Sequence, residues 1–121
     1  MSKEANKPVD GQRVSLNFYK TAAGNEPVLE WLRSLPDAER KAIGSDLSDA
    51  QFAWPVGMPL CRPLGGHLFE IRTSLSDKIA RIFVCFSDGG LVALHGFVKK
   101  TQKTPPGDIA LARKRMKDVI G

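Results

Sequence analysis

The sequence predicts an α+β fold in two layers, in which helices cover one face of an antiparallel β-meander. Three observations predict this arrangement. Apolar runs at residues 68–72, 79–86 and 91–99 alternate in two-residue steps, as strands do. Short polar turns at residues 76–77 and 88–90 join these runs, and such turns make consecutive strands antiparallel. Helical patterns on both sides of this block supply the covering layer.

A first N-terminal strand and two N-terminal helices are predicted before the meander. The strand covers residues 14–20, where β-branched and aromatic residues alternate with others. Asn25 is suited to cap the first helix, and Pro36 begins the second. The apolar residues of both helices recur at helical spacing: Val28, Trp31, Leu32 and Leu35 in the first, and Ile43, Leu47 and Ala50 in the second. Residues 54–66, rich in proline and glycine, are predicted to form an irregular loop.

A C-terminal helix is predicted after the third run. Thr104 can cap it, and Pro105 suits the first helical position. Ile109, Ala112 and Met116 form its apolar stripe. Residues 1–13 are polar and are predicted to be a disordered tail, so that residues 14–121 form a single domain.

Composition narrows the class of protein. A chain of 121 residues with 42% hydrophobic and 26% charged residues is typical of one globular domain. No apolar run approaches the roughly 20 residues of a membrane-spanning helix, and the N-terminus lacks the apolar segment of a signal peptide. We therefore expect a cytoplasmic protein that contacts no membrane. Cys61 and Cys85 lack the spacing of a zinc site, so we expect reduced thiols, no metal and no cofactor.

Positive charge is concentrated near the C-terminus. The formal net charge is +5, and residues 95–121 carry seven lysines and arginines against two aspartates. Such a patch favours contact with nucleic acid, because neutralised phosphates release counterions. The alternative is a solvated helix face whose cations complement the helix dipole. The residues open to both interpretations are Arg113, Lys114, Arg115 and Lys117.

Cations within the predicted meander share one face. Alternation in the third strand turns three residues toward the predicted core, namely Val92, Leu94 and Val98. The opposite face then carries Arg72, Arg81, His95 and Lys99. Because the helices are expected on the other side, these side chains form a cationic floor suited to a polyanion. Glu70 is predicted to orient an arginine. His95 is either a proton shuttle or a packing residue of the strand, and Phe97 either stacks on a base or packs in the core.

Three segments resemble a known family. They are residues 64–72, residues 81–86, and residues 94–105, which include the run FVKKTQKTP from Phe97 to Pro105. The resemblance extends over residues 14–119 and is to the phage-derived Gp49-like toxins of the HigB type, within the RelE/ParE superfamily. It implies a RelE-like fold and a toxin of a type II toxin–antitoxin system. Such a toxin cleaves messenger RNA on the ribosome, and a helix-turn-helix antitoxin of the HigA type silences it.

The chemistry implied is metal-independent attack of a ribose 2′-OH on the adjacent phosphate. This reaction needs alignment, stabilisation of the phosphorane charge and proton transfer. The candidate catalytic residues are Arg72, Arg81, His95, Lys99 and Lys100. The candidate RNA-binding residues are Phe97, Lys103, Arg113, Lys114 and Lys117. No tyrosine lies near the C-terminal motif, where some ribonucleases of the superfamily place one.

Two other functions fit the same sequence. A gyrase-inhibiting toxin of the ParE type would share the fold, because function depends on the site rather than on the fold. A non-catalytic nucleic-acid-binding protein or phage regulator would need only the basic patch. The full set of cations favours the ribonuclease.

Overall fold

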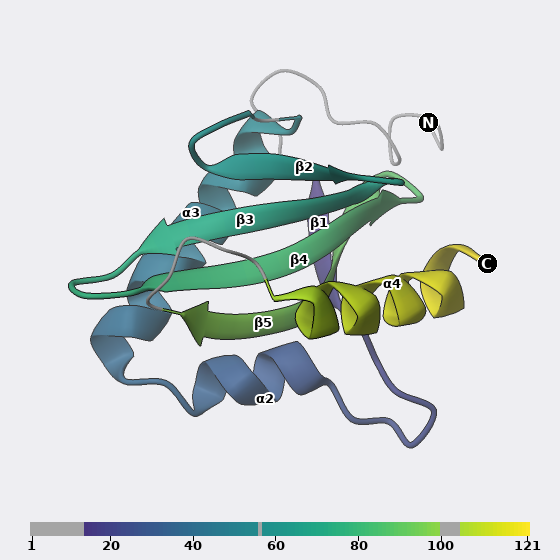
Figure 1. Cartoon of the computed structure of the whole chain (residues 1–121), viewed down its shortest axis with the longest axis horizontal. Coiled ribbons are helices and arrows are strands. Elements are labelled where there is room, and N and C mark those ends of the chain that lie inside the picture. The colour runs from purple at the N-terminus through teal and green to yellow at the C-terminus, as the bar shows by residue number, and fades with distance from the viewer. Residues whose placement is uncertain (1–13, 56, 100–104) are drawn as a thin grey trace.

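The computed structural model describes residues 14–55, 57–99 and 105–121, which form one sheet and three helices (Figure 1). The five strands are β1 (Ser15–Phe18), β2 (Cys61–Gly65), β3 (Leu68–Ser74), β4 (Ile79–Ser87) and β5 (Gly90–Lys99). The helices are α2 (Pro27–Arg33), α3 (Asp37–Ala53) and α4 (Pro106–Ile120). The strand order is β1-β5-β4-β3-β2. None of the described helices is long and apolar enough to cross a membrane.

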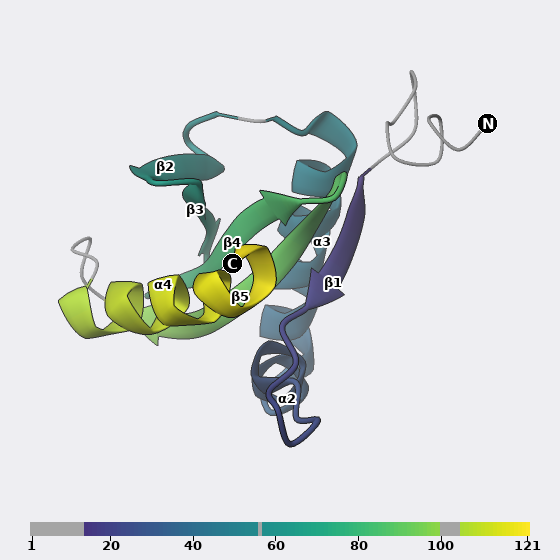
Figure 2. The same cartoon turned by 90° about the vertical axis from the view of Figure 1, so that its right-hand side faces the viewer.

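The predicted two-layer fold with an antiparallel meander is wrong. The sheet is mixed, because β1 pairs with β5 in parallel, whereas the other neighbours pair antiparallel. The helices do not form a single layer on one face either. Helices α2 and α3 lie on one side of the sheet and α4 lies on the other, which gives three layers (Figure 2).

Strand β2 forms inside the segment predicted to be an irregular loop. It pairs antiparallel with β3, with Cys61 opposite Ile71 and Arg62 opposite Glu70. Pro63 is compatible with this strand because β2 lies at the edge of the sheet, where a missing N–H leaves no ladder bond unmade. The proline and glycine content of the segment therefore predicted a loop, although a strand with this composition can form at the edge of a sheet.

Two apolar cores explain the three layers. The core beneath α2 and α3 includes Val28, Leu32, Ile43 and Leu47 from the helices and Ile71, Ala80, Ile82, Val84 and Ala93 from the sheet. The core beneath α4 contains Leu68, Phe83, Cys85, Leu94 and Ala112, with Ile109 and Met116 packed against it. Strand β4 contributes to both cores, so its central residues are buried on both faces.

A β-bulge changes the predicted orientation of β5. Phe83 pairs with His95 but Val84 pairs with Ala93, so that Leu94 is the extra residue. Val92 and Leu94 therefore pack in the core beneath α4 rather than with Val98, which packs in the core beneath α2 and α3. The predicted grouping of Val92, Leu94 and Val98 on one face is thus wrong. Alternation does not reveal a bulge, because the bulge shifts the phase within a continuous apolar run.

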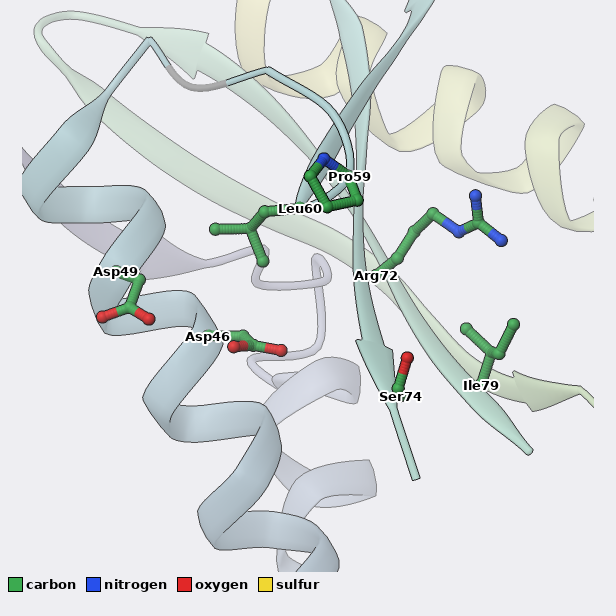
Figure 3. A pocket seen from close by; sticks show the side chains of 7 residues that line it. All are labelled: Asp46, Asp49, Pro59, Leu60, Arg72, Ser74 and Ile79. Carbon is green, nitrogen blue, oxygen red and sulfur yellow. The ribbon is translucent and has the colours of Figure 1, made fainter. Parts of the chain in front are cut away.

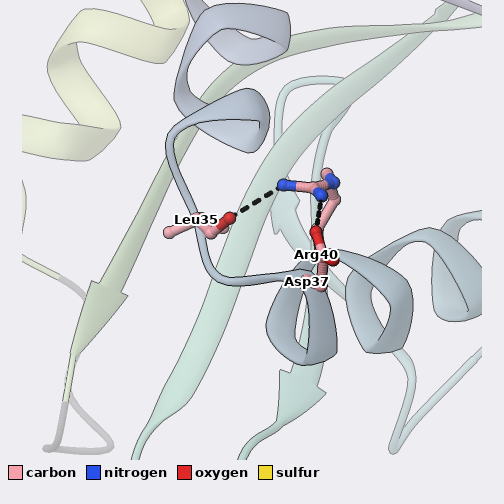
Figure 4. A network of polar contacts seen from close by, with 3 residues as sticks. All are labelled: Leu35, Asp37 and Arg40. Atoms are coloured by element: carbon pink, nitrogen blue, oxygen red, sulfur yellow. Dashed lines mark hydrogen bonds and ion pairs between the residues drawn. The ribbon is translucent and has the colours of Figure 1, made fainter.

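Arginines fix the positions of the helices. Arg40 of α3 donates a hydrogen bond to the carbonyl of Leu35 (2.8 Å) and pairs with Asp37, which closes the corner between α2 and α3 (Figure 4). Arg113 of α4 donates to the carbonyls of Leu64 (3.0 Å) and Gly65 (3.1 Å) at the end of β2. These bonds connect each helix to a neighbouring part of the fold.

A second arginine and a tyrosine attach α4 to the sheet. Arg115 donates to the carbonyl of Leu94 (2.8 Å) and lies over the ring of Tyr19, 5.4 Å from its centroid. The Tyr19 hydroxyl donates to Asp118 (2.6 Å), and this hydrogen bond raises the pKa of Tyr19. Polar bonds thus supplement the apolar contact along the length of α4.

We expect Arg113→Ala to lower the free energy of unfolding by about 1–3 kcal/mol, because it removes two hydrogen bonds from a charged donor. The matched control is Lys114→Ala, since Lys114 is the next residue on α4 and is exposed. Chemical denaturation followed by circular dichroism measures both. Equal stability of the two variants would show that Arg113 does not attach the helix.

Candidate nucleic-acid interface

The candidate residues stand in three rows across β3, β4 and β5, on the face that α4 partly covers. The strand register gives the rows as Glu70, Phe83 and His95; then Arg72, Arg81 and Phe97; then Ser74, Ile79 and Lys99. Neighbouring strands are about 4.8 Å apart and successive rows about 6.7 Å apart. The Cα atoms of His95 and Lys99 therefore lie within about 12 Å of the Cα atom of Arg72. Side chains that extend toward one another can span this distance.

Glu70 and Arg81 form a buried ion pair in the middle of these rows. Both side chains have no exposed area, and Arg81 Nη1 lies 3.4 Å from Glu70 Oε2. Glu70 also faces Arg72, whose Nε lies 4.0 Å from Oε1. The expected open cationic floor is therefore wrong for Arg81, which is covered. One carboxylate orients two arginines, and of the two only Arg72 reaches the surface.

Arg72 projects from β3 beside a hollow of about 550 Å³ (Figure 3). Asp46 and Asp49 of α3 line the opposite wall, whereas the guanidinium of Arg72 points away from both carboxylates. The side chain of Arg72 is 18% exposed. Because the aspartates repel anions, a phosphate is expected on the side of Arg72 that faces away from α3.

His95 is joined to the first turn of α4. Its Nε2 lies 2.5 Å from Oδ1 of Asp108, and both side chains are partly exposed. The imidazole stacks on Phe97 with ring centroids 5.5 Å apart, and Phe83 lies 6.2 Å away. Asp108 is not among the site residues predicted from the sequence. The one signal in the sequence is that Asp108 is one of only two acidic residues within the basic segment 95–121.

The remaining candidates differ in their availability to a ligand. Lys99, Lys114 and Lys117 are exposed, and Phe97 is half-buried between Phe83 and His95. Arg113 is engaged in hydrogen bonds to the end of β2. Lys100 and Lys103 lie outside the described residues.

The described part of the chain offers few groups that could bind a metal ion or act as a reactive thiol. No cluster of three or more histidines, cysteines, aspartates or glutamates occurs among residues 14–55, 57–99 and 105–121. Cys61 and Cys85 are free and buried, and burial raises the pKa of each thiol to about 11. Both thiols are therefore protonated at neutral pH and lack the exposure of reactive cysteines.

Comparison with protein families assigns the chain. Residues 30–117 match the model of the family described as phage derived protein Gp49-like (DUF891). The chain belongs to the Gp49-like family. The match runs from α2 through most of α4 and includes Arg72, Arg81, His95, Lys99 and Asp108. No curated protein matches the chain.

The buried pair of this Gp49-like protein predicts a large effect of truncation. We expect Arg81→Ala to lower the free energy of unfolding by about 3–5 kcal/mol, because it removes a cation that pairs with the buried carboxylate of Glu70. The double variant Glu70→Gln/Arg81→Met should recover much of this loss. Urea denaturation measures both, with Arg33→Ala on the exposed end of α2 as the control. A loss for Arg81→Ala no larger than that of the control contradicts the assignment.

The cysteines predict a pH dependence. In the folded protein the pKa of each thiol is about 11, above the ordinary value of 9.0. The contribution of the buried thiols to the free energy of unfolding is therefore fully present below pH 9 and is lost as the pH rises toward 11. We expect the variant Cys61→Ala/Cys85→Ala to lose less stability than the wild type between these pH values. A thiol reagent at pH 8 should label the native protein slowly and the unfolded protein rapidly. Rapid labelling of the native state would show that the thiols are accessible.

Proposed function

We propose that this Gp49-like protein is the toxin of a type II toxin–antitoxin system and cleaves messenger RNA on the ribosome. The observation that supports this most directly is the grouping of three accessible side chains, Arg72, His95 and Lys99, around a buried ion pair. A forked cation, an imidazole and an ammonium group can supply the charge stabilisation and the proton transfer that cleavage by a ribose 2′-OH requires. Membership of the Gp49-like family is compatible with this function.

Each side chain has a separate role in the proposed reaction. Arg72 binds phosphate oxygens with two N–H groups and stabilises the charge that develops on phosphorus. Lys99 adds positive charge at the end of β5, and Lys100 follows it in the sequence. His95 exchanges a proton with the substrate. Arg81 is a positioning residue, because it is buried and acts through Glu70 on Arg72.

The proposed partners are the ribosome with its messenger RNA and a helix-turn-helix antitoxin from an adjacent gene. The exposed lysines Lys99, Lys114 and Lys117 supply positive charge for RNA contact. An antitoxin that covers Arg72 and Lys99 would exclude phosphate from the site. Coexpression of the adjacent gene product should then restore growth.

We expect expression of the wild type to arrest growth, and primer extension to detect cuts within translated codons. Arg72→Ala should lower the cleavage rate roughly 100- to 1000-fold, because one preorganised charge contact in the transition state is lost. Arg33→Ala, on a helix of the opposite layer, is the matched control.

The result also separates the alternatives. A gyrase-inhibiting toxin would arrest growth without cutting messenger RNA, and a non-catalytic nucleic-acid-binding protein would do neither. Either pattern, obtained with folded protein, contradicts the ribonuclease.

A further inference from the structure

The contact between His95 and Asp108 joins two elements that the sequence separates. His95 lies in β5, and Asp108 lies in the first turn of α4. Their side chains meet at 2.5 Å through Nε2 of the ring and Oδ1 of the carboxylate. Among the residues that the structure describes, Nε2 is the ring nitrogen of His95 that has a hydrogen-bond partner. The two ring nitrogens are therefore chemically distinct.

Neighbouring contacts hold this pair in place. Phe97 stacks on the imidazole at an interplanar angle of 26°, which restricts rotation of the ring. Arg115 donates to the carbonyl of Leu94, the residue before His95, so that α4 also holds the backbone of β5 at this point. The His95 and Asp108 side chains remain 18% and 24% exposed, so a substrate can approach them.

We propose that Asp108 is a positioning residue that holds His95 as the Nε2–H tautomer, so that Nδ1 is the nitrogen that takes the proton from the substrate. A carboxylate accepts hydrogen bonds and donates none, so the proton between the two groups resides on Nε2. The lone pair of the neutral ring is then on Nδ1. This inference rests on the proposed ribonuclease function and adds Asp108 to its site.

The proton-transfer step balances without a cofactor. Nδ1 takes the proton of the ribose 2′-OH as the bond between the 2′-oxygen and phosphorus forms. The bond from phosphorus to the 5′-oxygen breaks, and that oxygen takes a proton from water. The hydroxide so formed removes the proton from Nδ1 and regenerates the neutral ring. Asp108 stays ionised throughout and stabilises the imidazolium while it exists, and no electron is transferred.

The first experiment measures the tautomer directly. The chain has two histidines, so His67→Gln leaves His95 as the single source of imidazole signals. In ¹⁵N-labelled protein with a neutral ring, we expect Nε2 to give the signal of a protonated nitrogen and Nδ1 that of an unprotonated one. Asp108→Asn should shift this distribution toward Nδ1–H, because an amide can donate to Nε2. A wild-type ring protonated at Nδ1 overturns the proposal.

The second experiment measures catalysis. Asp108→Asn should lower the rate of messenger RNA cleavage by about 100-fold while leaving the affinity for RNA within a factor of about two of the wild type. Asp118→Asn is the matched control, since Asp118 is also on α4 and also bonds to the sheet, through Tyr19. Its cleavage rate should equal that of the wild type. Asp108→Glu, which keeps the acceptor, should recover part of the rate.

The outcomes separate this inference from the proposed function. If the wild type cleaves messenger RNA and Asp108→Asn cleaves equally well, the positioning role of Asp108 is wrong and the ribonuclease stands. If Asp118→Asn loses as much activity as Asp108→Asn, attachment of α4 explains both and the proposal is overturned. If the folded wild type cleaves no messenger RNA, the ribonuclease is wrong, and the proton-transfer role of His95 is wrong with it.

Discussion

Helix α4 packs on the face of the sheet that carries Arg72, Arg81 and His95, and the candidate site depends on this contact. The helix is attached by an apolar core around Phe83 and Ala112 and by hydrogen bonds along its length. Because it covers only part of the face, it leaves Arg72 and His95 partly exposed. It also brings Asp108 to His95. The candidate site is thus formed by the docking of α4 rather than by the sheet alone.

The buried pair of Glu70 and Arg81 lies on the same face of the sheet as α4. A charge removed from water is tolerated only with a partner, and the desolvation of such a pair often exceeds its mutual attraction. The pair is therefore weak evidence that it stabilises the fold, whereas its geometry accounts for the orientation of the arginine side chains. Glu70 faces Arg81 and Arg72 from one carboxylate, so the position of Arg72 depends on a buried group. This dependence supports a positioning role for Arg81.

Short apolar runs bounded by turns were sufficient to locate β3, β4 and β5. The same runs were not sufficient to predict how many layers the fold has. Strand β4 is apolar on both faces, with Ile82 and Val84 on one and Phe83 and Cys85 on the other, and such a pattern indicates that both faces are covered. The apolar residues on both faces of β4 therefore indicate a helix on each side of the sheet. The parallel pairing of β1 with β5 and the edge strand β2 had no local signal, because both depend on tertiary contacts.

The charge of the C-terminal segment shows why the site was only partly predictable. Seven cations in residues 95–121 indicate a surface for polyanions, but composition does not distinguish a solvated cation from one that bonds to the backbone. Arg113 and Arg115 donate to carbonyls of the sheet, whereas Lys114 and Lys117 are exposed on the same helix. A guanidinium is more weakly hydrated than an ammonium and holds its donors in a planar fork, so it is better suited to a partly buried bond with a carbonyl. On α4, therefore, the arginines attach the helix and the lysines are available to a polyanion.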